Sequence, residues 1–111
     1  ADTKTRLYRF DSLKNKIKNP VTFLDDFDVK DMVTAADTSQ DGKMLAVLTY
    51  KMIWLFLKPA NSDNYLKGKH YSMPIKAKQC EGICFSRNKL LITNEQGEMF
   101  YISINKLINN N

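Results

Sequence analysis

The sequence predicts an all-β protein made of short antiparallel strands. Runs rich in Val, Ile, Leu, Phe, Tyr and Thr are separated by turn residues, which is the pattern of strands. No stretch of useful length has the spacing of an amphipathic helix. Residues 34–56 and 79–102 also share the same order of apolar runs and turns, which indicates a repeated β-unit.

Nine strands are expected, each placed by its apolar residues and by the turn residues beside it. In chain order they span residues 5–11, 21–27, 32–39, 43–50, 52–58, 70–75, 79–85, 89–95 and 98–104.

Local patterns justify the strands of the first half. Leu7 alternates with arginines, so the first strand has one solvent-facing side. Residues 12–19 carry the only faint helical pattern, which Pro20 stops. Asp41–Gly42 predicts a hairpin turn because this pair tolerates positive φ. The next two strands are almost entirely apolar, which predicts that both of their faces are covered.

The second half follows the same logic. Residues 59–64 form a polar loop, and the strand after it is expected at a sheet edge because Pro74 cannot donate a ladder hydrogen bond. Gln96–Gly97 joins the last two strands. We expect the tail, residues 105–111, to add at most a strand residue or two and then to fray.

Size and composition fit one folded domain, residues 1–111. The hydrophobic share of 43% with mixed charges argues against a disordered chain. The longest apolar run, residues 52–57, is far shorter than the ~20 residues that span a bilayer. The start at Ala1 fits signal cleavage, a cloning remnant or a cut inside a larger protein, and the sequence does not choose among them.

The net charge of +5 comes mainly from basic residues in two regions, 4–18 and 58–78, with an acidic group at 25–31 between them. A surface for anionic partners is one interpretation. Ordinary solvated loops are the expected one, because the charge is modest and both signs are interspersed.

Cys80 and Cys84 lie four residues apart in one predicted strand, on the same face. Their Cα atoms would be about 13 Å apart at the rise of a strand, whereas a disulfide needs less than about 7 Å. We therefore expect small core residues. A metal or redox pair is disfavoured because the single histidine, His70, has no metal-ligand spacing and is expected at the surface.

Three strands of the first unit match three strands of the second in the same order, at offsets of 45 or 46. A period near 46 with several strands per unit is typical of four-stranded propeller blades. The units span about residues 32–58 and 79–104, so with the leading strand the chain holds about two and a half blades. The matched segments are residues 36–39 with 82–85, 45–49 with 90–94 and 53–56 with 99–102.

These segments resemble known β-propellers. "SQDGKMLAVLTYKMIWLF" resembles the "S-P-D-G-K-x-L-A" hairpin of WD-like and Tol-type propellers, with Gln40 where Pro is usual. "CEGICFSRNKLLITNEQGEMFYI" resembles a blade of SdiA-regulated-like, phytase-esterase-like and gluconolactonase-like propellers. Many such proteins, common in Bacteroidetes, have no assigned function. The resemblance covers residues 32–104 and implies an exported location, periplasmic or secreted.

Two and a half blades do not close a ring, since propellers usually need at least four. We expect a terminal piece of a longer propeller, with a ring completed by oligomerisation as the second reading and a compact sandwich or barrel as the third. Self-association through exposed blade faces follows from the first two, because a repeat does not bury its own hydrophobic face.

The resemblance also implies site residues. In gluconolactonase-type propellers the acidic residue of an "E-G" motif points into the channel and binds a divalent cation, and Glu81–Gly82 matches it. Asn94 offers an oxygen ligand of the kind that Ca²⁺ accepts, and Asp37 is a second channel-lining candidate. The plainer reading is that Glu81 pairs with a cation of the protein or faces water. Without the resemblance, the residues imply no cofactor.

We therefore expect a non-enzymatic binding scaffold of unidentified ligand. The alternative is part of a metal-dependent lactonase or esterase-like propeller, with Glu81 as ligand. A second alternative is a domain for single-stranded nucleic acid, suggested by aromatics interleaved with lysines. Core packing is the preferred account of most of these aromatics. No phosphate loop or nucleophile motif supports a catalytic residue.

Overall fold

The computed structural model describes residues 4–10, 21–76 and 80–109. The faint helical pattern at 12–19 lies outside this part of the chain. The elements are β1 (Lys4–Phe10), β2 (Val21–Asp28), β3 (Val33–Thr38), β4 (Met44–Thr49), β5 (Met52–Leu57), the 3₁₀ turn η1 (Tyr65–Lys67), β6 (His70–Pro74), β7 (Cys80–Ser86), β8 (Lys89–Asn94), β9 (Met99–Ser103) and α1 (Ile104–Asn109).

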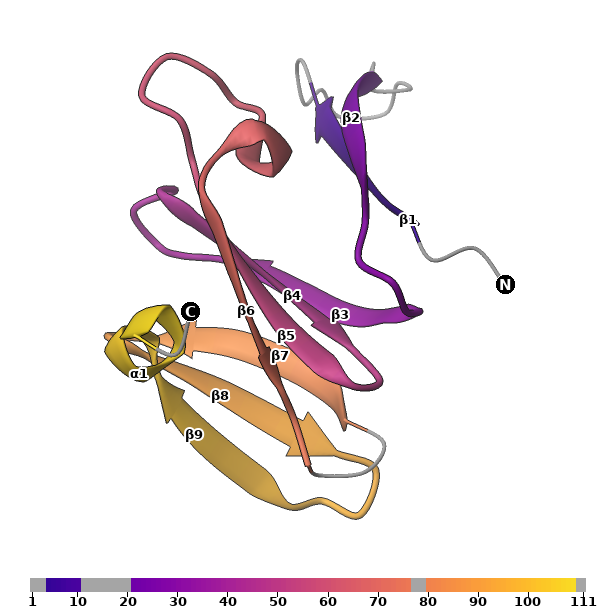
Figure 1. Ribbon diagram of the computed structural model, residues 1–111, viewed down its shortest axis with the longest axis vertical. Coiled ribbons are helices and arrows are strands. Elements are labelled where there is room, and N and C mark those ends of the chain that lie inside the picture. Colours follow the sequence, from indigo (N-terminus) through magenta and orange to yellow (C-terminus); the bar gives the residue numbers. More distant parts are fainter. Residues whose placement is uncertain (1–3, 11–20, 77–79, 110–111) are drawn as a thin grey trace, which may run out of the picture.

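All described strand pairs are antiparallel, so the predicted all-β antiparallel class is confirmed. They form a first sheet of two strands (β1–β2), a second of four (β3–β6) and a third of three (β7–β9). Each sheet follows chain order. The sheets lie as successive layers with the second sheet in the middle, and they form no closed ring (Figure 1). The four-stranded unit expected from the repeat is therefore present only in the second sheet.

The middle sheet is covered on both faces, as its apolar strands predict. Ala46 and Leu48 of β4 join a core cluster shared with the third sheet and α1. Leu45 and Val47, which point the other way, join a smaller cluster shared with the first sheet and η1. All four are buried, so alternation along one strand supplies two cores.

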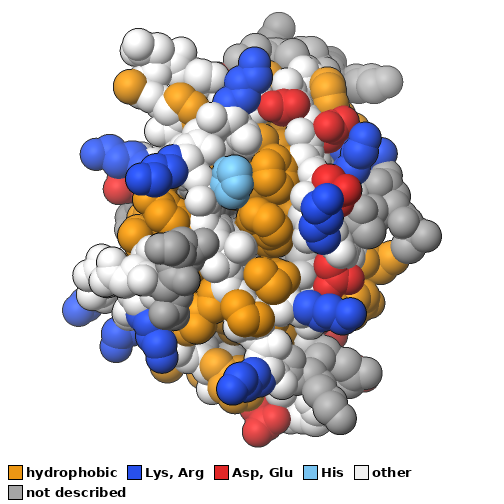
Figure 2. Space-filling view, viewed as in Figure 1, with side chains coloured by type: hydrophobic (Ala, Val, Ile, Leu, Met, Phe, Trp, Pro, Cys, Tyr) orange, Lys and Arg blue, Asp and Glu red, His pale blue; other side chains and the backbone are white. Residues whose placement is uncertain are grey.

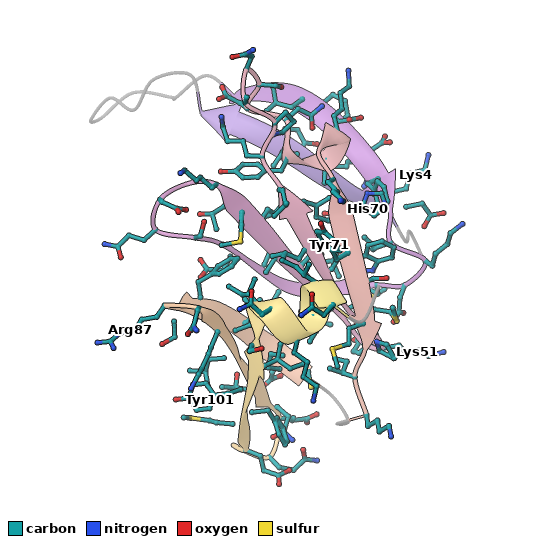
Figure 3. All side chains as sticks on the ribbon, turned by 60° about the vertical axis from the view of Figure 1, so that its left-hand side comes forward. Lys4, Lys51, His70, Tyr71, Arg87 and Tyr101 are labelled. Atoms are coloured by element: carbon teal, nitrogen blue, oxygen red, sulfur yellow. The ribbon has the colours of Figure 1, made fainter. Side chains whose placement is uncertain are left out.

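The tail corrects the sequence prediction, because residues 104–109 form a helix and not a strand end. The hydroxyl oxygen of Ser103 accepts the backbone N–H of Lys106 at 2.9 Å, which caps the first turn. Ile104, Leu107 and Ile108 share one face at helical spacing, and this face packs into the larger core cluster. The helix contacts β6 and β9 and lies between these outer strands (Figure 3).

The two cysteines also depart from the prediction. Cys80 is buried and Cys84 is exposed, so they do not share a face. The β7–β8 register shifts between Cys80 and Gly82, which leaves Glu81 as the extra residue of a β-bulge. One inserted residue reverses the side to which every following side chain points. The sequence predicted no disulfide between them because of the Cα–Cα distance along a strand. In the structure both are free cysteines.

The predicted turn at Asp41–Gly42 is confirmed, with Gly42 at φ 73°. The Asp41 carboxylate accepts the Ser39 hydroxyl at 2.7 Å and the Lys43 backbone N–H at 3.0 Å. These bonds, led by that of Ser39, hold the pKa of Asp41 below its ordinary value. The turn that joins β3 to β4 is therefore fixed by side-chain hydrogen bonds as well as by glycine.

Candidate functional site

A hollow of about 330 Å³ lies where the second and third sheets meet, at the ends where β3 and β7 begin. We call it the acidic hollow because Glu81 and Glu95 both line it, together with the phenol-bearing Tyr50. All three side chains are exposed, so a ligand reaches them from solvent. The remaining lining residues are Val33, Thr34 and Cys80.

Local structure brings the two glutamates together. The bulge at the start of β7 turns Glu81 outward while Cys80 remains in the core. Cys80 pairs with Asn94, the last residue of β8, so Glu95 follows directly beside the bulge. Glu95 was not among the site residues predicted from the sequence. The signal for it was the hairpin register, which brings the residue after β8 next to the start of β7.

One hydrogen bond fastens the floor of the hollow across the two sheets. The Thr34 hydroxyl donates to the backbone carbonyl of Cys80 at 3.0 Å and approaches that of Leu48 at 3.4 Å. Burial raises the pKa of the Cys80 thiol, so this cysteine is a poor source of thiolate. The groups of the hollow that a ligand can contact are therefore two carboxylates and a phenol. Thr34 and Cys80 lie beneath them and have a structural role.

Asn94 is engaged elsewhere. Its side-chain amide N–H donates to Glu98 Oε1 at 2.9 Å, and its side-chain oxygen accepts the backbone N–H of Glu98 at 2.9 Å. The residue is buried in the β8–β9 turn and is not among the residues that line the acidic hollow. Asn94 therefore precedes Glu95 of the hollow in the sequence, but both groups of its side-chain amide are hydrogen-bonded within the β8–β9 turn.

Asp37 lies toward the other end of β3. Its carboxylate accepts the backbone N–H of Phe85, in β7, at 2.9 Å. With Thr34 it gives β3 two polar attachments to the third sheet. Asp37 also lines a groove of about 600 Å³ with Ser39, Asp41 and Arg87, between the β3–β4 and β7–β8 turns. Glu81 and Asp37 therefore do not converge on one site.

No group of three or more His, Cys, Asp or Glu side chains gathers at metal-binding distance within residues 4–10, 21–76 and 80–109. Two carboxylates with a neighbouring phenol suit a different ligand. An ammonium or guanidinium group is attracted by the carboxylates and by the face of the tyrosine ring. The acidic hollow can therefore bind an organic cation with the side chains that it has.

The aromatic residues divide into two groups. Phe56 is buried, and half-buried Phe27 and Trp54 pack around it, with ring centroids 5.2 Å and 6.2 Å from its own. His70 is exposed, as expected, and its ring lies against this cluster beside a run of hydrophobic side chains (Figure 2).

The second group consists of exposed aromatics that core packing does not explain. Tyr8, Tyr50, Phe100 and Tyr101 are exposed. Tyr50 borders the acidic hollow, and the Lys89 ammonium lies 5.6 Å from the centre of the Tyr101 ring. These rings are dispersed over different sheets and turns, so they do not form one stacking platform.

No protein-family model, curated protein or solved structure matches this chain. Within its described residues, no helix combines the length and apolar character needed to cross a membrane.

Proposed function

We propose that this chain is a non-enzymatic binding module, a segment of a β-propeller-type stack that holds a cationic group at the acidic hollow. The chemistry fits an arginine or lysine side chain of a protein partner. The observation that carries the proposal is the convergence of Glu81, Glu95 and Tyr50 on one hollow between two stacked sheets.

The stacking supports the propeller-type reading. β7 lies against β3, the first strand of one sheet on the first strand of the next. The bond from the Thr34 hydroxyl to the Cys80 carbonyl joins residues 46 positions apart, which equals the period found in the sequence. Blades of a propeller pack in this way, each on the equivalent strands of its neighbour.

The charge of the hollow supports the class of ligand. Neither glutamate side chain makes a hydrogen bond or ion pair within the described residues, so both are available to a ligand. Carboxylates bind guanidinium groups with charge-assisted hydrogen bonds, which are stronger than neutral ones. A non-enzymatic role fits because the hollow holds these hydrogen-bond acceptors but lacks a nucleophile that a neighbouring base activates.

The probe for this proposal is the neutral-ended tripeptide acetyl-Gly-Arg-Gly-amide, followed by amide chemical shifts of the labelled protein. We expect saturable shifts at Tyr50, Glu81 and Glu95, and a dissociation constant raised at least tenfold by Glu81→Gln combined with Glu95→Gln. The peptide with Gln in place of Arg, and the protein variant Asp26→Asn, are the matched controls. Equal shifts with the Gln peptide would refute the cation reading.

A divalent-cation titration separates this proposal from the lactonase-like alternative. Ca²⁺, Mg²⁺ and Mn²⁺ are added singly while thermal unfolding is followed. Our proposal expects no saturable rise in Tm beyond the effect of matched ionic strength. A saturable rise that Glu81→Gln abolishes would favour a metal site at Glu81 and replace the proposed function.

A further inference from the structure

The edge strand β9 has an unusual composition for its position. It pairs with β8 and with no second strand among the described residues, so one side of its backbone is open. Its five residues, Met99–Ser103, carry no charge and no proline, and their register with β8 has no shift. Met99 is 58% exposed, Phe100 38% and Tyr101 59%.

Other edges of the structure are protected. β6 contains Pro74 and follows Lys69, and β1 contains Lys4 and Arg6 and has a register shift after Leu7. Lysine, proline and bulges are the features that prevent edge strands from pairing with other chains. The edge strands β2, β3 and β7 each contain an acidic residue and a register shift in their pairing. Because β9 has none of these features, it is the described edge best suited to accept another strand.

Both sides of β9 offer apolar contacts to such a strand. On the inner side, Phe100 and Ile102 line a groove of about 430 Å³ between β9 and β6, with Ile75 and Ile92 on its other walls. Tyr101 lies on the outer side of the third sheet (Figure 3). Met99, two residues before it in the same strand, shares this face because side chains alternate along a strand. A strand added at this edge would cover side chains on both faces, besides pairing the open backbone groups.

We propose that this strand is β9 of a second copy, paired antiparallel about a two-fold axis at Tyr101. In this register each Tyr101 lies opposite its counterpart, Met99 lies opposite Ser103, and Phe100 lies opposite Ile102. The two third sheets become one continuous six-stranded sheet. The Phe100–Ile102 pairs extend the apolar groove on each side of the axis, and the contact is isologous and closed.

Charge complementarity favours a second copy as the occupant. The same register places Glu98 opposite Ile104 of the partner subunit. Lys106, two residues further along α1, borders the groove with Phe100 and Ile102. Glu98, whose Oε1 also accepts the Asn94 side-chain amide, and Lys106 are both exposed, so the proposed register brings an acid and a base to the same end of the paired strands on each side of the axis. The β9 residues between Glu98 and Lys106 carry no charge. Lys89 of β8, whose ammonium lies 5.6 Å from the centre of the Tyr101 ring, is the cation beside the axis in each copy.

The first test is the solution mass by sedimentation equilibrium from micromolar to millimolar protein. We expect a reversible monomer–dimer equilibrium, the monomer being 12.8 kDa. Tyr101→Lys should raise the dissociation constant at least tenfold, with an unchanged far-UV circular dichroism spectrum. Tyr8→Lys is the matched control, because Tyr8 is a similarly exposed strand tyrosine, on the first sheet, and should leave the equilibrium unchanged.

A monomer at all concentrations would overturn the proposal, as would open-ended aggregation, because a two-fold contact closes. An equal effect of Tyr8→Lys would place the contact on the first sheet instead. Cross-linking gives a readout that does not depend on a disruptive variant. With oxidised glutathione as oxidant, Tyr101→Cys in a Cys84→Ser background should form a covalent dimer, whereas Tyr8→Cys in that background should not.

Discussion

Replacing Asp37 tests the attachment between the second and third sheets. Asp37→Ala removes the acceptor of the Phe85 backbone N–H, which the carboxylate now accepts at 2.9 Å in a half-buried position. A buried backbone donor left without a partner costs about 1–3 kcal/mol. Asp37→Asn retains a side-chain oxygen at the same place, so its cost should be clearly smaller.

The assay is urea unfolding followed by the fluorescence of Trp54, the single tryptophan, and by circular dichroism. Taking a loss of about 2 kcal/mol and an m value of about 1.5–2 kcal/mol/M, the midpoint of Asp37→Ala should fall by about 1 M. Glu81→Ala, at an exposed position, should change stability by less than about 0.5 kcal/mol. If Asp37→Ala were as stable as the parent, or if Asp37→Asn were equally disruptive, the bond would not hold the sheets.

Three further outcomes are expected. Leu55→Ala, at a side chain that is 0% exposed in the larger core cluster, should cost about 2–5 kcal/mol in urea unfolding; a loss under 1 kcal/mol would contradict the packing of the third sheet on the second. The Asn64 amide, which donates to Asp25, holds the pKa of that carboxyl below its ordinary value of 3.8, so its contribution to stability is present above that value and lost as pH falls through the lowered one. Asp25→Asn should therefore reduce the loss of stability between pH 5 and 2, and an unchanged pH profile would argue against the bond. In the native protein, Cys84 should react with Ellman's reagent at least tenfold faster than Cys80, as scored by mass spectrometry, and equal rates would contradict the burial of Cys80.

The strands were predictable because their signals are local. Alternation around Leu7, the continuous apolar run of Met44–Leu48 and the Asp41–Gly42 turn each act within a few residues. The helix α1 was not predictable in the same way. Six residues are too few to form a stable helix by themselves, and α1 depends on burying Ile104 and Leu107 between distant strands.

The candidate site was predictable only in part. Glu81 was found from its motif, and the structure places it in a hollow. Its orientation depends on a one-residue bulge, which also places Cys80 and Cys84 on opposite faces. The glycine that follows, Gly82, is the kind of residue that marks a bulge within a strand, but it was interpreted only as part of the "E-G" motif. Glu95 was missed because its proximity to Glu81 arises from hairpin register. The bond from Asp37 to β7 spans 48 positions, so only tertiary structure shows it.

The most direct test of the account is a nuclear Overhauser spectrum that asks which strand lies against β3. The stacking predicts cross-peaks between the Thr34 side chain and the backbone protons of Cys80 and Glu81, because the Thr34 hydroxyl lies 3.0 Å from the Cys80 carbonyl oxygen. These cross-peaks would establish the sheet stack on which the acidic hollow depends. Their absence, with cross-peaks from Thr34 to another strand in their place, would contradict both the stacking and the proposed site.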